Sequence, residues 1–196
     1  MKWPNAEVPY VISRSFSPED RRVIGSAMAT YHQRTCIRFV PRRTQSDYIK
    51  IIKSQESING WANNPGCWAQ KGRVGGAQEL SLDDGCVHVA TIVHELMHAV
   101  GFDHEQERPD QENYITVNFD NIEPRNHQWF TPKPADEVNS LGRYDLNSVM
   151  HYSAYAFAVD SSRPTIEAKD GRSTLGNSRG LTSTDVRKLK ALYCGY

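Results

Sequence analysis

The sequence lacks the features that direct a protein to nucleic acid or to a lipid bilayer. Its 23 basic and 23 acidic residues cancel to a formal net charge of zero, whereas binding to nucleic acid or to an anionic membrane surface usually needs a basic excess. No apolar run approaches the roughly 18 residues of a membrane-spanning helix. We therefore expect neither nucleic acid nor a membrane as partner, and we expect the 196 residues to form one domain.

Cysteine is also scarce. The chain has four cysteines, no two of them form a Cys-x-x-Cys pair, and their spacing is not that of a zinc knuckle. Disulfide bonds are the better interpretation, and they indicate an oxidising, extracellular setting. Four cysteines can pair in three ways, so the spacing alone leaves the pairing open. The alternative is four free, buried thiols in a cytosolic protein. The sequence has no Asn-x-Ser/Thr sequon, so no N-glycan site supports secretion.

One segment is rich in potential metal ligands. His94 and His98 are four residues apart, so on a helix both imidazoles leave the same face. Gly101 allows the chain to turn back after the helix, which lets His104 reach the same point from another direction. Three protein ligands leave a fourth position for water, which is the pattern of a catalytic zinc site. Glu95 lies beside the first ligand, within reach of such a water.

The surroundings of this segment argue against a surface helix that carries two histidines by chance. The apolar residues make it the most apolar helix in the chain, and polar residues in a core helix need a partner or a function. These apolar residues are Val89, Ile92, Val93, Leu96, Ala99, Val100 and Phe102.

A second motif, Ser148-Val149-Met150-His151-Tyr152, follows further along the chain. A zinc motif of the form HExxHxxGxxH with a methionine turn downstream defines the metzincin peptidases. Additional segments narrow the resemblance from the metzincins as a whole to one family. From about Trp3 to Cys194 the chain resembles the astacin family of metallopeptidases. These segments are Thr35 to Pro41, Gly66-Cys67-Trp68, Gly85-Cys86-Val87 and Glu105 to Tyr114.

The resemblance implies roles for several residues of the site. It implies one zinc ion per chain, with Glu95 as general base. It implies that Tyr152 is an extra zinc ligand that swings away when substrate binds and then stabilises the negative oxygen formed in the reaction. Met150 is expected to form an apolar floor under the three histidines. Glu105 is expected not to bind the metal. In the family this residue forms a buried charge pair with the mature N-terminus, a partner that a chain trimmed at its start would lack.

The resemblance also implies the disulfide pairing and a mode of substrate binding. The implied pairs are Cys36–Cys194 and Cys67–Cys86. An extended substrate is expected to pair with the edge strand that contains Cys67 and Trp68. The candidates for a pocket cation that selects an acidic residue just after the cleaved bond are Lys169, Arg172 and Arg179, and we prefer Arg179 because it lies just before the C-terminal helix. The alternative is that Arg179 is a solvated surface arginine.

Together these patterns predict a secreted zinc endopeptidase that cleaves extracellular proteins, as a monomeric domain with a protein or peptide substrate. The runner-up is a non-catalytic, zinc-dependent extracellular recognition module on the same fold. Loss of Glu95 or of a histidine would mark that class, and all four residues are present. No signal peptide precedes Trp3, so we expect a mature catalytic domain that begins several residues after the usual mature N-terminus.

A competing motif is weaker. Gly176-Asn177-Ser178-Arg179-Gly180 matches the nucleophile pattern of serine hydrolases. A nucleophile elbow needs a strong strand before it and a histidine after the serine. The residues before it are polar and turn-like, and the last histidine, His151, precedes it. We therefore reject a serine hydrolase.

The predicted fold is α+β, of the zincin or metzincin type. A twisted sheet with two helices forms an N-terminal lobe of about residues 1–101, and an irregular C-terminal lobe of about 102–196 closes a cleft with zinc at its floor. We expect helices over 17–33, 87–100 and 182–193, strands over 36–40, 48–52, 67–70 and 76–82, and a loop over 54–66. The second half has no sheet signal: residues 113–118 indicate a strand or a turn, and 122–130 a short helix.

Overall fold

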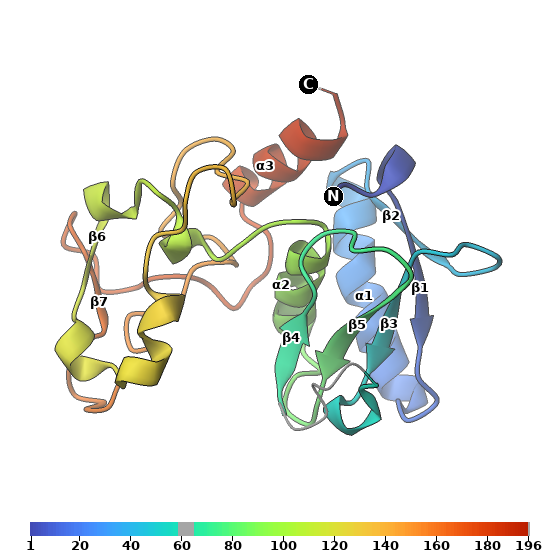
Figure 1. The fold of residues 1–196 in the computed structure, drawn as a ribbon, viewed down its shortest axis with the longest axis horizontal. Helices are drawn as coiled ribbons and strands as arrows, with labels where there is room; N and C mark the ends of the chain where they lie inside the picture. The colour runs from blue at the N-terminus through green and yellow to red at the C-terminus, as the bar shows by residue number, and fades with distance from the viewer. Residues whose placement is uncertain (59–64, 196) are drawn as a thin grey trace.

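The structure is a computed structural model that describes residues 1–58 and 65–195. The sheet and the two longer helices of the first half lie side by side with a second lobe of short elements (Figure 1). The α+β architecture predicted from the sequence is confirmed. Part of the expected loop over 54–66 lies outside the described residues, and its described beginning contains the 3-10 helix Ser54–Glu56.

The first lobe is built on a five-stranded sheet with the order β2-β1-β3-β5-β4. The first four strands of that order are parallel to one another, and β4 is antiparallel to β5. β4 therefore ends the sheet and is its antiparallel edge. The strands are β1 (Glu7–Ile12), β2 (Arg38–Pro41), β3 (Tyr48–Ile52), β4 (Cys67–Ala69) and β5 (Ala77–Leu82).

Strand β1 was not predicted from the sequence, and Pro9 explains why. Proline cannot donate to a β-ladder, so it argues against a strand in the interior of a sheet. In the structure Pro9 lies opposite Val40 of β2, and pairing with β3 starts only at Tyr10. At Pro9 the strand thus has a neighbour on one side only, and the missing N–H costs no ladder bond on the other side.

Two helices pack against each other beside this sheet. α1 (Pro18–Arg34) starts with a capping box, in which the Ser17 hydroxyl and the Asp20 carboxylate accept hydrogen bonds from each other's backbone N–H groups. Buried Tyr31 of α1 donates its hydroxyl hydrogen to the Val93 carbonyl of α2 (Val89–Ala99) at 2.6 Å. This contact holds α2 against α1 in the core of the first lobe.

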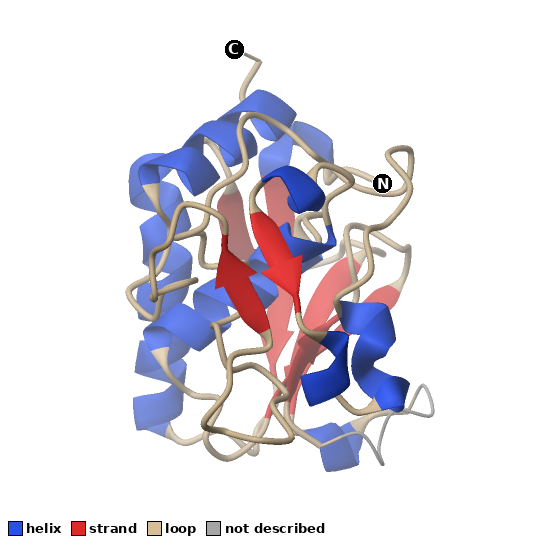
Figure 2. Cartoon of the chain, turned by 90° about the vertical axis from the view of Figure 1, so that its left-hand side faces the viewer, coloured by secondary structure: helices blue, strands red, loops and turns tan. Residues whose placement is uncertain are grey.

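The second lobe contains a small sheet, so the expectation of no sheet in this half is wrong. β6 (Ile115–Val117) pairs antiparallel with β7 (Ile166–Ala168), and Figure 2 shows the pair in front. Each strand has three residues, which is too short to give a recognisable alternating pattern. Residues 113–118 thus contain a strand, and the short helix expected over 122–130 is the 3-10 helix Pro124–Trp129. A second apolar cluster, with Phe130 fully buried, fills this lobe.

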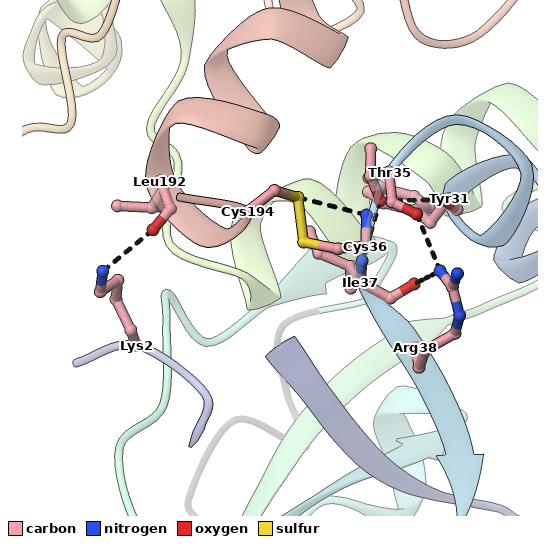
Figure 3. The surroundings of a disulfide bond; sticks show 8 residues. All are labelled: Lys2, Tyr31, Thr35, Cys36, Ile37, Arg38, Leu192 and Cys194. Atoms are coloured by element: carbon pink, nitrogen blue, oxygen red, sulfur yellow. Dashed lines mark hydrogen bonds between the residues drawn. A yellow bond between two sulfur atoms is a disulfide. The ribbon is translucent and has the colours of Figure 1, made fainter. Parts of the chain in front are cut away.

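The C-terminal helix α3 (Ser183–Tyr193) returns to the first lobe, since Leu181 and Leu189 are part of that lobe's core. Cys194 at its end forms a disulfide with Cys36, just before β2, and Lys2 donates to the carbonyl of Leu192 (Figure 3). The second disulfide joins Cys67 and Cys86, so both implied pairs are confirmed. On a chain-entropy argument the long link stabilises the fold by about 5 kcal/mol and the short one by about 3 kcal/mol.

None of the helices in the described part of the chain is both long enough and apolar enough to cross a membrane.

Candidate metal centre

The three histidines of the motif converge on one point. Their Nε2 atoms lie 3.1 Å apart for His94 and His98, and 3.2 Å from each of these to His104. His94 and His98 project from successive turns of α2, which ends at Ala99. Gly101 then takes a φ of 110°, a value that strongly favours glycine, and the chain turns to bring in His104. The structure thus has the turn that the sequence predicted at Gly101.

Each imidazole is oriented by a partner on its other nitrogen. Two of the partners are backbone carbonyls and the third is a carboxylate. The Nδ1 atom of His94 lies 2.7 Å from the Val149 oxygen, that of His98 lies 2.8 Å from the Phe102 oxygen, and that of His104 lies 3.0 Å from Glu107 Oε2. Because carbonyls and carboxylates accept hydrogen bonds, the Nδ1 atoms carry the hydrogen and the Nε2 lone pairs face one another.

This donor set fits a zinc ion. Within the described residues, these histidines form the group of His, Cys, Asp or Glu side chains that could hold a metal. Burial lowers the pKa of all three, and neighbouring histidines lower it further for His98 and His104. The imidazoles are therefore neutral near pH 7, as metal binding requires. Three neutral nitrogen ligands with one open position match a catalytic zinc site.

Glu95 is a buried carboxylic acid next to the first of these histidines. Its side chain is in the interior of the protein, 5% exposed, and burial raises its pKa to about 8. A pKa close to the working pH suits a group that must both accept and return a proton. The burial and the raised pKa are compatible with the general-base role predicted for Glu95 from the sequence.

The methionine turn supports the histidines from the side of α3. The Val149 carbonyl accepts from His94, and the Met150 carbonyl accepts from the Glu105 N–H at 2.9 Å. Asp185, in the first turn of α3, accepts from the Ser148 hydroxyl at 2.6 Å and from the Val149 N–H at 3.1 Å. Met150 is 1% exposed and belongs to the core of the first lobe. The start of α3 therefore fixes the turn that orients His94.

Tyr152 leaves this turn beside the third histidine. Its ring centroid lies 4.6 Å from that of His104 and 5.6 Å from that of Phe157. Burial raises the pKa of its hydroxyl well above the usual value. The hydroxyl is therefore protonated at neutral pH and can donate a hydrogen bond.

Glu105 faces a lysine. Lys188 Nζ lies 2.5 and 2.6 Å from the two carboxylate oxygens of Glu105, and both side chains are buried. The resemblance implied the mature N-terminus as the family's partner for this residue. In this structure the cations beside it are Lys188 of α3 and, at 3.5 Å, Arg108. Periodicity places Lys188 on the inner face of the helix, one turn before Leu192 and one turn after Asp185, but it does not show that the partner is Glu105.

The candidate substrate-binding residues lie in two places. Cys67 and Trp68 are in β4, the edge strand, opposite Leu82 and Ser81 of β5. Arg179 is exposed and lines a cavity of about 530 Å³. The other residues that line this cavity are Asn147, Thr174, Gly176, Asn177, Ser178, Gly180, Leu181 and Thr182.

The loop that carries Arg179 packs directly on the methionine turn. Gly176 donates its N–H to the Leu146 carbonyl at 2.8 Å, and a Cβ at this position would come within 2.3 Å of the His151 oxygen. The close approach requires glycine, which explains the glycine of the Gly-x-Ser-x-Gly pattern without a nucleophilic serine. Arg179 thus lies on a loop that contacts the methionine turn, and its selector role stays a prediction.

Comparisons with known proteins agree with this geometry. The family model for astacin, a peptidase family, matches residues 1–194. Zinc metalloproteinase nas-8 of Steinernema carpocapsae is 41% identical over 196 residues, which are 98% of this chain and 44% of that protein. Zinc metalloproteinase nas-7 of Caenorhabditis elegans is 40% identical over 193 residues, which are 97% of this chain and 48% of that protein. The chain therefore spans about half the length of these relatives.

A solved structure extends the comparison to the fold. High choriolytic enzyme 1, a hatching enzyme zinc-protease from the medaka Oryzias latipes, matches with a TM-score of 0.87 and 34% identity. The match covers 99% of this chain and 93% of that chain. Sequence and fold agree over nearly the full length, and the chain belongs to the astacin family of zinc metallopeptidases.

Proposed function

We propose that this chain is a single, monomeric catalytic domain of a secreted zinc endopeptidase that cleaves peptide bonds of extracellular proteins. The observation that carries the proposal is the convergence of three Nε2 atoms, 3.1–3.2 Å apart, together with the buried Glu95 that follows His94 in the same helix. The two disulfides support an oxidising compartment. Membership of a peptidase family supports a protein or peptide substrate.

The chemistry divides between the metal and the side chains. His94, His98 and His104 would hold one zinc ion. Zinc, when bound, supplies a Lewis acid that polarises a carbonyl and lowers the pKa of water to about 7. Glu95 accepts the proton of the attacking water and returns it to the leaving amine. The Tyr152 hydroxyl donates a hydrogen bond to the substrate oxygen on which negative charge develops.

An extended substrate would be aligned along β4, the last strand in the order of the sheet. A peptide added to an edge strand gains main-chain hydrogen bonds whatever its side chains are, and pockets for alternate side chains then give specificity. Cys67 and Trp68 are the residues of β4 that we propose for this contact. The short disulfide at Cys67 anchors the edge strand to Cys86, which precedes α2.

The test is cleavage of a peptide library by the purified domain, with and without zinc. We expect cleavage that stops after chelation and returns when zinc is restored. A recognition module would bind peptides in the presence of zinc without cleaving them. Binding without cleavage by zinc-loaded protein would contradict the proposal and favour that module.

Replacing Tyr152 with Phe should reduce turnover and leave zinc binding intact. The change removes only the hydroxyl, and a hydrogen bond to a charged group is worth about 1.5–3 kcal/mol. We therefore expect kcat to fall by roughly 10- to 100-fold with little change in KM. Steady-state kinetics on a fluorogenic peptide measures both constants. A change confined to KM would instead assign the hydroxyl to substrate binding.

Replacing Arg179 with Ala should reduce cleavage before Asp or Glu. A guanidinium binds a carboxylate with two parallel hydrogen bonds, so its loss should cost about 10-fold or more on acidic substrates and little on neutral ones. Arg172→Ala is the control, because Arg172 is an exposed arginine on the same segment that pairs with Asp170. If both substrate types decline together, or neither does, Arg179 is not the selector.

A further inference from the structure

The three histidines differ in what holds them. His94 and His98 are on a rigid helix and donate to backbone carbonyls, whereas His104 lies after the turn, outside any helix. Its Nδ1 partner is the carboxylate of Glu107, at 3.0 Å, in the 3-10 helix Glu105–Glu107 that follows it. Glu107 is 1% exposed. The least constrained ligand therefore has the strongest acceptor, because charged acceptors make hydrogen bonds about twice as strong as neutral ones.

Glu107 is fixed in place by a lysine. Lys133 Nζ lies 3.0 Å from Glu107 Oε1, and the Lys133 N–H donates to the Glu107 carbonyl at 2.8 Å. The same ammonium lies 2.8 Å from Asp103, which also pairs with Lys71. A buried carboxylate is retained only when paired, and Lys133 is that partner. The oxygens of Glu107 are thus divided, with Oε2 toward His104 and Oε1 toward Lys133.

We propose that Glu107 is a positioning residue for the metal centre. Its carboxylate holds His104 in the tautomer with hydrogen on Nδ1, and so aims the Nε2 lone pair of His104 at the point shared with His94 and His98. Lys133 holds the carboxylate in turn. Such carboxylate–histidine contacts orient the ring and raise the basicity of the ligand nitrogen. The proposal rests on the metal site of the proposed function and adds a residue outside the motif.

The competing explanation is that Glu107 and Lys133 form a structural ion pair that happens to touch a histidine. Asp103 separates the two explanations. It also lies against Lys133, and its side chain is almost as buried as that of Glu107. Although it precedes His104 in the chain, its carboxylate accepts no hydrogen bond from the imidazole among the described residues. Removing the charge of Asp103 disturbs Lys133 but leaves Glu107 in place as the acceptor for His104.

The experiment measures zinc affinity by competition with a chromophoric chelator, and stability by urea unfolding of the zinc-free protein. Glu107→Leu removes the acceptor, and we expect zinc affinity to fall by about 10- to 100-fold. Glu107→Gln keeps the shape and offers a neutral oxygen like the partners of His94 and His98, so we expect a smaller loss of several-fold. Asp103→Asn should bind zinc within about twofold of the parent. These readouts do not depend on peptidase activity.

A second measurement reports the tautomer directly. In zinc-free protein with ¹⁵N-labelled histidine, NMR should show His104 with hydrogen on Nδ1 in the parent, and a mixture of tautomers in Glu107→Leu. Unchanged zinc affinity in Glu107→Gln and in any folded Glu107→Leu protein would overturn the proposal, as would an equal loss in Asp103→Asn and Glu107→Gln. If the parent itself binds no zinc, the proposed function fails first, and that result is distinct from these.

Discussion

Glu95→Gln should give a folded, zinc-binding protein with turnover reduced by about 100- to 10,000-fold. Glutamine keeps the shape of glutamate, but a neutral amide cannot accept the proton of the attacking water. The three histidines are unchanged, so the metal should stay. Steady-state kinetics on a fluorogenic peptide gives the loss in kcat, and metal analysis gives the zinc content of the same sample.

Glu95→Asp is the matched variant for this test. It keeps the carboxylate but shortens the side chain, so it should recover part of the activity that the amide loses. Near-normal turnover of Glu95→Gln with full zinc content would show that another group is the base. Loss of zinc in that variant would instead assign Glu95 to metal binding.

His98→Ala should remove nearly all of the zinc. Its Nε2 atom lies 3.1 Å from that of His94 and 3.2 Å from that of His104, so it takes part in two of the three contacts of the cluster. Two histidines leave too few ligands for a tight site, since zinc is held by three protein ligands in catalytic centres. Metal analysis after dialysis should find about one zinc per chain in the parent and almost none in the variant.

The His98→Ala variant should also show how much of the stability of the folded protein comes from bound zinc. A ligand at 1,000 times its dissociation constant stabilises the folded state by about 4 kcal/mol. Chelation should therefore lower the melting temperature of the parent and leave that of His98→Ala unchanged. His88→Ala is the control, because His88 is an exposed histidine at the start of the same helix. Full zinc retention in His98→Ala would refute the assignment of the site.

The metal centre could be predicted because its geometry is local. The helical repeat sets the distance between His94 and His98, and glycine at position 101 permits the turn. Strand β3 was predicted with its observed bounds because its five residues are mostly β-branched or aromatic. Patterns within ten or so residues of each other are visible in a single sequence.

The supports of the centre could not be predicted, because they depend on contacts between distant segments. Lys188 meets Glu105 across 83 residues, and Asp185 meets Ser148 across 37. Glu107 is close to His104 in sequence, but nothing in an acidic residue at that spacing shows that it is buried. Strand β1 was missed for a related reason. Whether Pro9 removes a ladder hydrogen bond depends on which neighbouring strand is paired at that residue, and a single sequence does not show this.

Helix α3 connects the first lobe to the segments around the metal centre. Its end is linked to the first lobe through Cys194 and Cys36, while Asp185 and Lys188 bind the segments that carry Ser148 and Glu105. Segments linked in this way have little freedom to move relative to one another. Little of the free energy of substrate binding should then be lost in ordering the residues around the metal centre, because a preorganised site loses little conformational entropy when it is filled.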